Sequence, residues 1–297
     1  MKKYITLLLI VLAITSCSSD YLNTSPTNKT KPGELYASTE NAKAAINGMA
    51  KLMIRQYQSS GFNGEGTIKM YYGNYQGQHF YKNLPGWAKM QNMDFTLSSD
   101  NTYTTYPWHY YYMLIGNANP LIEAIDFATG KEEDRLYIKA QALTFRAYAY
   151  MQLNQIYGQR WSDSDDGNNP SVVLRIKSGS EPIALSSQND VYKQIYKDLD
   201  DAIEMFEASG VKRRSEFFYE PNLDVAHAVY ARAAITKGDH ENAVKHAQLA
   251  SKNYSLMSND QYKSGFSTPN SEWIWGSYNA PDETLHYWSF YAYIGYN

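Results

Sequence analysis

Apolar side chains recur at helical spacing over much of this chain, and that periodicity limits the fold more than any other feature. The clearest case is residues 132–157, a segment followed by Gly158. Five of its residues fall on one helical face: Leu136, Ala140, Leu143, Ala147 and Tyr150. Spacings of three and four residues are typical of amphipathic helices, whereas half-buried strands alternate every second residue. We therefore expect a mostly α-helical fold.

The same pattern predicts further helices. Their ranges are 42–53, 108–125, 191–208, 224–237 and 241–254. Ser38 or Thr39 is placed to cap the first helix, and Pro120 should kink or break the second. Between them lie two irregular regions, roughly 59–105 and 160–188, and the chain beyond Tyr254 is again polar and aromatic.

The last predicted helix pair has the character of a repeat unit. Gly238, Ala243, His246 and Ala250 have the spacing of a tetratricopeptide unit, in which a glycine forms the turn and small residues let the helices pack closely. Residues 198–206 echo the second helix of an earlier unit. These features favour a tetratricopeptide-like helical scaffold that holds long, irregular, aromatic-rich loops.

The N-terminus indicates export and lipid anchoring. Met1-Lys2-Lys3 precedes an apolar run that ends at Ile14, which is typical of a signal peptide and short for a membrane-spanning helix. Ile14-Thr15-Ser16-Cys17 resembles a lipobox, and Cys17 is the only cysteine of the chain. An ordinary signal peptide with a chance cysteine is the alternative. We predict a signal peptide over 1–16 and acylation of Cys17, because several acyl chains anchor a protein durably. Residues 17–37 would then form a polar tether.

Composition narrows the partners. The formal net charge is −3, with 27 Lys and Arg against 30 Asp and Glu, so no basic surface for nucleic acid is indicated. Tyr (28) and Trp (6) together far outnumber Phe (10), and such rings suit half-wet positions where a ring face meets a ligand. A single cysteine rules out a disulfide within the chain and a cysteine-based zinc site.

Aromatic residues in predicted loops or at helix entries are the candidate binding residues. They are Trp87, Tyr103, Tyr106, Tyr278, Tyr287 and Trp288. A sugar ring offers an apolar C–H face for stacking, although each of these rings could instead form a small core under its loop. Trp273 and Trp275 alternate with Ile274, which favours a strand with both rings on one face, and we expect them in the core.

Other chemistry is weakly indicated. Residues 163–169 could begin a calcium loop, but Gly167 is fifth and Leu174 twelfth, so a solvated acidic turn is the preferred interpretation and no cofactor is expected. The histidines lack metal-ligand spacing. A glycosidase would need two positioned carboxylates, and nothing fixes Glu272, Asp282 or Glu283. Arg146 should bind backbone or a carboxylate between helices.

Several segments, in order, resemble the SusD/RagB family of nutrient-binding lipoproteins. The matching segments are Cys17 with Asp20-Tyr21-Leu22 and Pro26, residues 116–122, residues 140–150 with Arg146-Ala147 and Tyr150, Tyr192 to Ile203 with Asp198-Leu199, residues 225–233 with Gly238-Asp239, and residues 271–275. The resemblance implies a helical side that packs on a SusC-type TonB-dependent transporter of the outer membrane. It implies an opposite, loop-rich side that captures oligosaccharide, or peptide in some members, without catalysis.

Family members usually continue beyond the length of this chain, so we expect a C-terminally truncated protein. Residues 38–254 would form the scaffold and 255–297 the start of an incomplete ligand-binding portion. The function expected is glycan capture at the cell surface. A peptide-binding member of the same family and, from another class, a surface glycoside hydrolase remain as alternatives.

Overall fold

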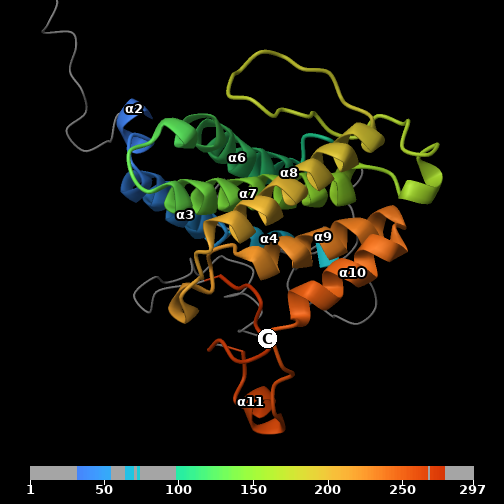
Figure 1. Cartoon of the computed structure of the whole chain (residues 1–297). Helices are drawn as coiled ribbons and strands as arrows, with labels where there is room; N and C mark the ends of the chain where they lie inside the picture. The colour runs from blue at the N-terminus through green and yellow to red at the C-terminus, as the bar shows by residue number, and fades with distance from the viewer. Residues whose placement is uncertain (1–31, 55–63, 70–71, 74–97, 267, 278–297) are drawn as a thin grey trace, which may run out of the picture. The chain divides into compact units, whose positions relative to one another are not determined.

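The computed structural model describes residues 32–54, 64–69, 72–73, 98–266 and 268–277, and Figure 1 shows their arrangement. The chain divides into two compact units, Met1–Leu35 and Tyr36–Asn297. The described part of the first unit is the short helix α2 (Pro32–Leu35). All other described elements belong to the second unit.

The regular secondary structure of the second unit, over the residues described, is helical. Its α-helices are α3 (Thr39–Leu52), α4 (Gly64–Lys69), α6 (Thr102–Ala124), α7 (Glu132–Tyr157), α8 (Gln188–Ser209), α9 (Leu223–Lys237), α10 (His240–Ser251) and α11 (Asn259–Lys263). Short 3₁₀ helices follow or join them at η5 (Ile125–Phe127), η6 (Trp161–Asp163) and η7 (Ser215–Phe217). The mostly α-helical prediction is confirmed.

Helix α7 lies at the centre of this unit. It packs against α3, α6, α8 and α9, and Figure 1 shows α6, α7 and α8 running side by side. Every residue from Ala140 to Asn154 is buried. The predicted apolar stripe is therefore only part of the buried surface, because neighbouring helices cover α7 on all sides.

Helix α6 begins at Thr102 rather than near Trp108, with Asn101 capping it, and it continues through Pro107 and Pro120. Pro120 therefore does not end the helix. The hydroxyl of Tyr157, on α7, bridges two backbone groups of α6 in place of one of that helix's own hydrogen bonds. It donates to the Thr104 carbonyl at 2.5 Å and accepts from the Trp108 amide at 2.8 Å. These groups are four residues apart, so the phenol occupies the position of a helical hydrogen bond beside Pro107.

Helices α9 and α10 form the predicted hairpin. Gly238 between them has a φ of 79°, a left-handed conformation that glycine adopts without steric cost. The buried residues of α10 are Ala243, His246 and Ala250, the small and medium residues that the repeat pattern places at the contact. The tetratricopeptide-like expectation is confirmed for this pair.

Two local predictions need adjustment. Ser38, and not Thr39, caps α3, and its side chain accepts from the Asn41 amide at 3.2 Å. Within the region predicted to lack helices, residues 64–69 form α4, while most of 59–97 lies outside the described residues. The 160–188 segment is irregular, as expected, apart from η6 and one antiparallel bridge between Pro170 and Ser187.

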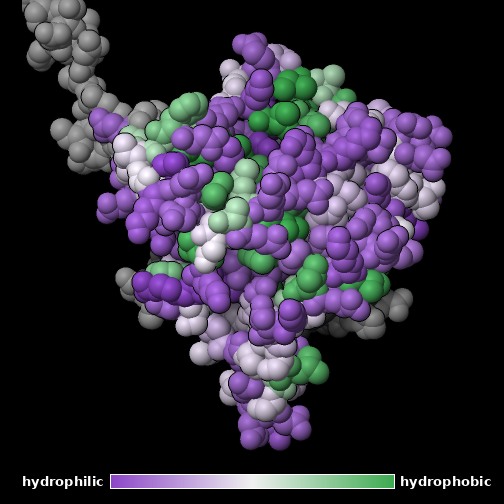
Figure 2. All heavy atoms as spheres, in the orientation of Figure 1, coloured by the Kyte–Doolittle hydropathy of each residue, from purple (hydrophilic) through white to green (hydrophobic). Residues whose placement is uncertain are grey.

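The surface of the described residues is mixed. Figure 2 shows a face that is largely hydrophilic, with hydrophobic residues in separate patches. Among the described helices, none combines the length and apolar character needed to cross a membrane.

Candidate ligand-binding site

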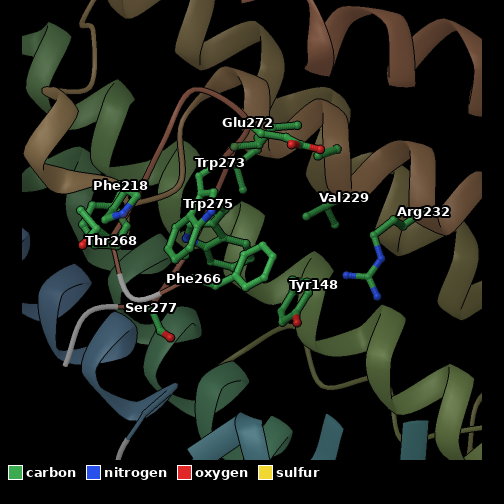
Figure 3. A pocket seen from close by; sticks show the side chains of 15 residues that line it. Tyr148, Phe218, Val229, Arg232, Phe266, Thr268, Glu272, Trp273, Trp275 and Ser277 are labelled. Atoms are coloured by element: carbon green, nitrogen blue, oxygen red, sulfur yellow. The ribbon is translucent and has the colours of Figure 1, made fainter. Parts of the chain in front are cut away.

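Helix α9 and the described residues of the segment 266–277, which are Phe266 and 268–277, border a cavity of about 810 Å³, which we call the aromatic cavity (Figure 3). Five aromatic side chains line it: Tyr148, Phe218, Phe266, Trp273 and Trp275. Val229 and Arg232 of α9 and Glu272 of the segment also contribute to the wall. Ring faces and a few polar groups in one hollow are the usual composition of a small-molecule site.

Trp275 is fixed by contacts on several sides. Its indole Nε1 donates to the Tyr219 carbonyl at 2.9 Å. Its ring makes edge contacts with Phe145 and Tyr148, with centroids 5.7 Å and 5.2 Å apart. Trp275 therefore rests on the core of α7 and still contributes to the cavity wall.

Trp273 is held less deeply, against Phe218, with ring centroids 6.1 Å apart. The chain returns past this ring at Gly276, where an added Cβ would lie 2.9 Å from the Trp273 ring. Real Cβ atoms do not approach so closely, so this turn of the chain requires glycine. Trp273 and Trp275 are both half-buried.

The predicted strand at Trp273 and Trp275 is wrong, because residues 271–277 form turns and bends. Asn270 explains the difference. Its side-chain oxygen accepts from the Glu272 amide at 3.0 Å, and its backbone carbonyl accepts from the Trp273 amide at 3.2 Å. Such local bonds compete with strand pairing.

An arginine ties this segment to the loop between α8 and α9. Arg213 donates to the Ile274 carbonyl at 2.9 Å and to the Glu220 carbonyl at 2.8 Å. The Glu272 carboxylate accepts from the Met257 amide at 3.0 Å. The cavity wall is therefore held by specific polar contacts, and one ring, Phe266, stands 56% exposed at its edge.

A buried polar cluster lies behind one end of the cavity. Glu65 Oε1 accepts from the Tyr111 hydroxyl at 2.8 Å and from the Tyr148 hydroxyl. Burial and the neighbouring Glu65 carboxylate raise the pKa of both tyrosines well above the usual range. Lys69 Nζ lies 3.4 Å from the same carboxylate oxygen. Tyr148 thus links the cluster to the cavity.

The predicted binding residues have different outcomes. Trp87, Tyr278, Tyr287 and Trp288 lie outside the described residues, as do Asp282 and Glu283. Tyr103 is half-buried in the first turn of α6.

Tyr106 is fully buried, and its hydroxyl donates to the Gly64 carbonyl at 2.8 Å. Because α6 begins before it, Tyr106 is a core position of a helix rather than a residue at a loop edge. We therefore correct its assignment from the binding site to the core.

The sequence interpretation did not single out Tyr148, Phe218 or Phe266. Tyr148 falls inside a long helical run, and its chemistry depends on Glu65, which is distant in sequence. Phe266 stands between Gly265 and Ser267, and an aromatic ring in a small-residue turn was the one available signal.

The acidic segment 163–169 forms a tight turn. Asp165, Asp166 and Gly167 all have positive φ, and the Gly167 amide donates to Ser164 Oγ at 2.9 Å. Within the described ranges, no three His, Cys, Asp or Glu side chains are grouped to hold a metal ion. The pair of histidines that does meet is His227 and His246, on α9 and α10.

Comparisons with known proteins agree with this fold. Residues 20–235 match the SusD-like family described as "Starch-binding associating with outer membrane". The chain is 27% identical over 256 residues to SusD-like protein P2 of Formosa agariphila, covering 85% of this chain and 47% of that protein.

Solved structures are also similar. A SusD-like carbohydrate binding protein from Bacteroides vulgatus superposes with a TM-score of 0.74 at 23% identity, covering 85% of this chain and 53% of that one. A laminarin binding SusD-like protein superposes with a TM-score of 0.57 at 18% identity, covering 75% and 46%. The chain thus spans about half the length of these relatives.

Proposed function

The chain belongs to the SusD-like family, and from that premise we propose that it captures oligosaccharide at the cell surface for import, without catalysis. The observation that carries the proposal is the aromatic cavity, in which rings from α7, the α8–α9 loop and the 266–277 segment face one hollow. Pyranose rings stack their C–H faces on such side chains while polar neighbours bind hydroxyl groups. The names of relatives, as carbohydrate-binding and laminarin-binding proteins, support the same ligand class.

Loop aromatics would extend this site. We retain Trp87, Tyr103, Tyr278, Tyr287 and Trp288 as proposed ligand contacts, since the sequence predicts them in loops or at a helix entry, where an aromatic ring can stack on a sugar.

Location and partner complete the proposal. Acylated Cys17 would hold the protein on the outer membrane. Residues 1–16 would be removed as the signal peptide, and residues 17–37 would remain as the tether. The helical scaffold over 38–254 would pack on a SusC-type TonB-dependent transporter, and 255–297 would begin the ligand-binding portion.

The experiment uses Phe266, the most exposed ring of the cavity, so that truncation leaves the core intact. We expect Phe266→Ala to weaken oligosaccharide binding about tenfold by isothermal titration against a panel of glucans, including laminarin oligosaccharides. Phe127→Ala is the control, because Phe127 is 88% exposed and lies at η5, away from the cavity. Equal affinity in both variants would remove the aromatic cavity from the site, and release of reducing ends during titration would contradict the absence of catalysis.

A further inference from the structure

Two positive charges approach Tyr148 at one end of the aromatic cavity, Arg232 in the cavity wall and Lys69 in the cluster behind it. Arg232, exposed on α9, reaches the Tyr148 hydroxyl from the cavity side (Figure 3). Lys69, on α4, places its ammonium 5.6 Å from the centre of the Tyr148 ring. The two cations therefore converge on one tyrosine although they come from distant segments.

The negative charge at this end is smaller. Glu65 is the carboxylate behind this end, and it is 6% exposed and already accepts from Tyr111 and Tyr148. It pairs with Lys69 at 3.4 Å. Within the described part of the chain, no carboxylate oxygen lies within 4.0 Å of the Arg232 guanidinium. The guanidinium is thus held by a phenol and keeps donors available to the cavity.

The proximity of the cations has an electrostatic effect. Burial lowers the pKa of Lys69, the Glu65 carboxylate opposes that change, and the charge of Arg232 adds to the lowering. Like charges close together in a partly desolvated site are unfavourable, and an anion placed between them is favoured.

The other charged group of the cavity does not offset this end. Glu272 comes from the 266–277 segment, and its carboxylate is engaged by the Met257 amide at 3.0 Å. Figure 3 shows Glu272 and Arg232 on separate parts of the wall. The cavity therefore has a cationic end next to its ring surfaces.

We propose that the Arg232 end of the aromatic cavity binds the acidic group of a sugar, a uronate carboxylate or a sulfate ester, and so selects anionic oligosaccharides over neutral ones. This inference rests on the proposed function. A guanidinium matches the paired oxygens of either group, and the adjacent rings supply stacking for the sugar itself. Tyr148 and Glu65 act as positioning residues that orient the guanidinium from behind.

The test compares charged and neutral forms of the same sugars on the full chain in detergent. The probes are oligogalacturonides, the same oligomers fully methyl-esterified, sulfated galactan oligosaccharides, and their desulfated forms. We expect at least one acidic form to bind about tenfold more tightly than its neutral counterpart, with affinity that falls as sodium chloride rises. Which acidic form binds distinguishes a carboxylate ligand from a sulfate ligand.

Two variants test whether Arg232 causes the preference for acidic sugars. Arg232→Gln should weaken binding of the acidic form far more than binding of the neutral form, so that the preference of about tenfold is lost. Arg160→Gln is the matched control, since its side chain is 88% exposed and lies outside this cavity, and it should leave both affinities unchanged.

The outcomes separate the two proposals. Neutral and acidic forms binding equally well, or Arg232→Gln weakening both alike, would overturn the anionic selectivity and leave glycan binding standing. Binding of no sugar at all would overturn the proposed function and this inference with it.

Discussion

Arg146 on α7 binds Asp198 on α8 through two parallel hydrogen bonds, Nε to Oδ2 at 2.8 Å and Nη2 to Oδ1 at 2.7 Å. The remaining nitrogen, Nη1, donates to Asn119 Oδ1 on α6 at 3.0 Å and to the Ile176 carbonyl at 3.2 Å. One guanidinium therefore joins three helices and the 160–188 segment. The expectation that Arg146 binds backbone or a carboxylate between helices is confirmed, and it binds both.

Removing either partner of this pair should destabilise the fold strongly. Asp198 is 1% exposed, so Asp198→Ala leaves a buried guanidinium without its counter-charge, at a cost of about 3–5 kcal/mol in the free energy of unfolding. Urea denaturation measures it. Asp201→Ala, which breaks the exposed Lys197–Asp201 pair, should cost less than about 1 kcal/mol. Similar midpoints for the two variants would contradict this role.

The contact of α9 with α10 should depend on pH. His227 and His246 face each other with their Nδ1 atoms 3.0 Å apart, which requires one of them to be unprotonated there. Burial, the other histidine and Lys245 lower the pKa of His246 to about 4, with Asp239 opposing, and burial lowers that of His227, with Glu207 and Asp224 opposing.

A lowered pKa in the folded state means that the unfolded chain binds more protons below its own pKa of about 6.5. Stability should therefore fall as the pH drops from about 6.5 toward 4, by about 1–2 kcal/mol from this pair. His246→Gln should flatten that part of the profile in thermal melts, whereas His240→Gln, on the exposed side of α10, should not. Parallel profiles for all three proteins would argue against the pair.

The helix hairpin offers a packing test. Ala243 is 7% exposed at the contact of α10, so Ala243→Leu should overpack it and cost about 1–3 kcal/mol. Ala247→Leu places the same side chain on the exposed side of α10 and should be close to neutral. If both variants melt together with the parent, the close packing inferred for this pair is not present.

Membrane attachment should depend on the sulfur atom of Cys17. Cys17→Ala removes the thiol that would carry the lipid, and we expect the protein to leave the membrane fraction. Fractionation after a high-salt wash measures this. Retention of the variant in membranes would place the anchor elsewhere.

The loop aromatics can be tested independently of the cavity. Trp87→Ala or Trp288→Ala should weaken oligosaccharide binding about tenfold, about 1.4 kcal/mol, with unchanged melting, because few residues usually dominate such sites. Titration with the same glucan panel measures it. Full affinity in both variants would limit the site to the cavity.

Local signals account for what could be predicted. The bounds of α7 follow from an acidic first turn and Gly158, and the hairpin turn follows from Gly238, features that act within a few residues. The start of α6 was missed because the region before Trp108 shows no helical periodicity. The hydroxyl that replaces a backbone hydrogen bond beside Pro107 belongs to Tyr157, far along the chain.

The site was less predictable for the same reason. The rings of Tyr148, Phe218 and Trp275 come together only after three segments pack against one another. The spacing of these residues along the chain does not indicate that they share a cavity. Glu65 is buried and paired through tertiary contacts, so its role beside Tyr148 also required the fold.

The Tyr157 hydroxyl has a consequence for local unfolding. This hydroxyl belongs to the last turn of α7, and it bridges the Thr104 carbonyl and the Trp108 amide of α6. Fraying at the end of α7 therefore breaks hydrogen bonds near the start of α6. These two turns should open as one cooperative unit. The Trp108 amide, near the start of its helix, should then exchange its hydrogen at the rate set by the end of α7.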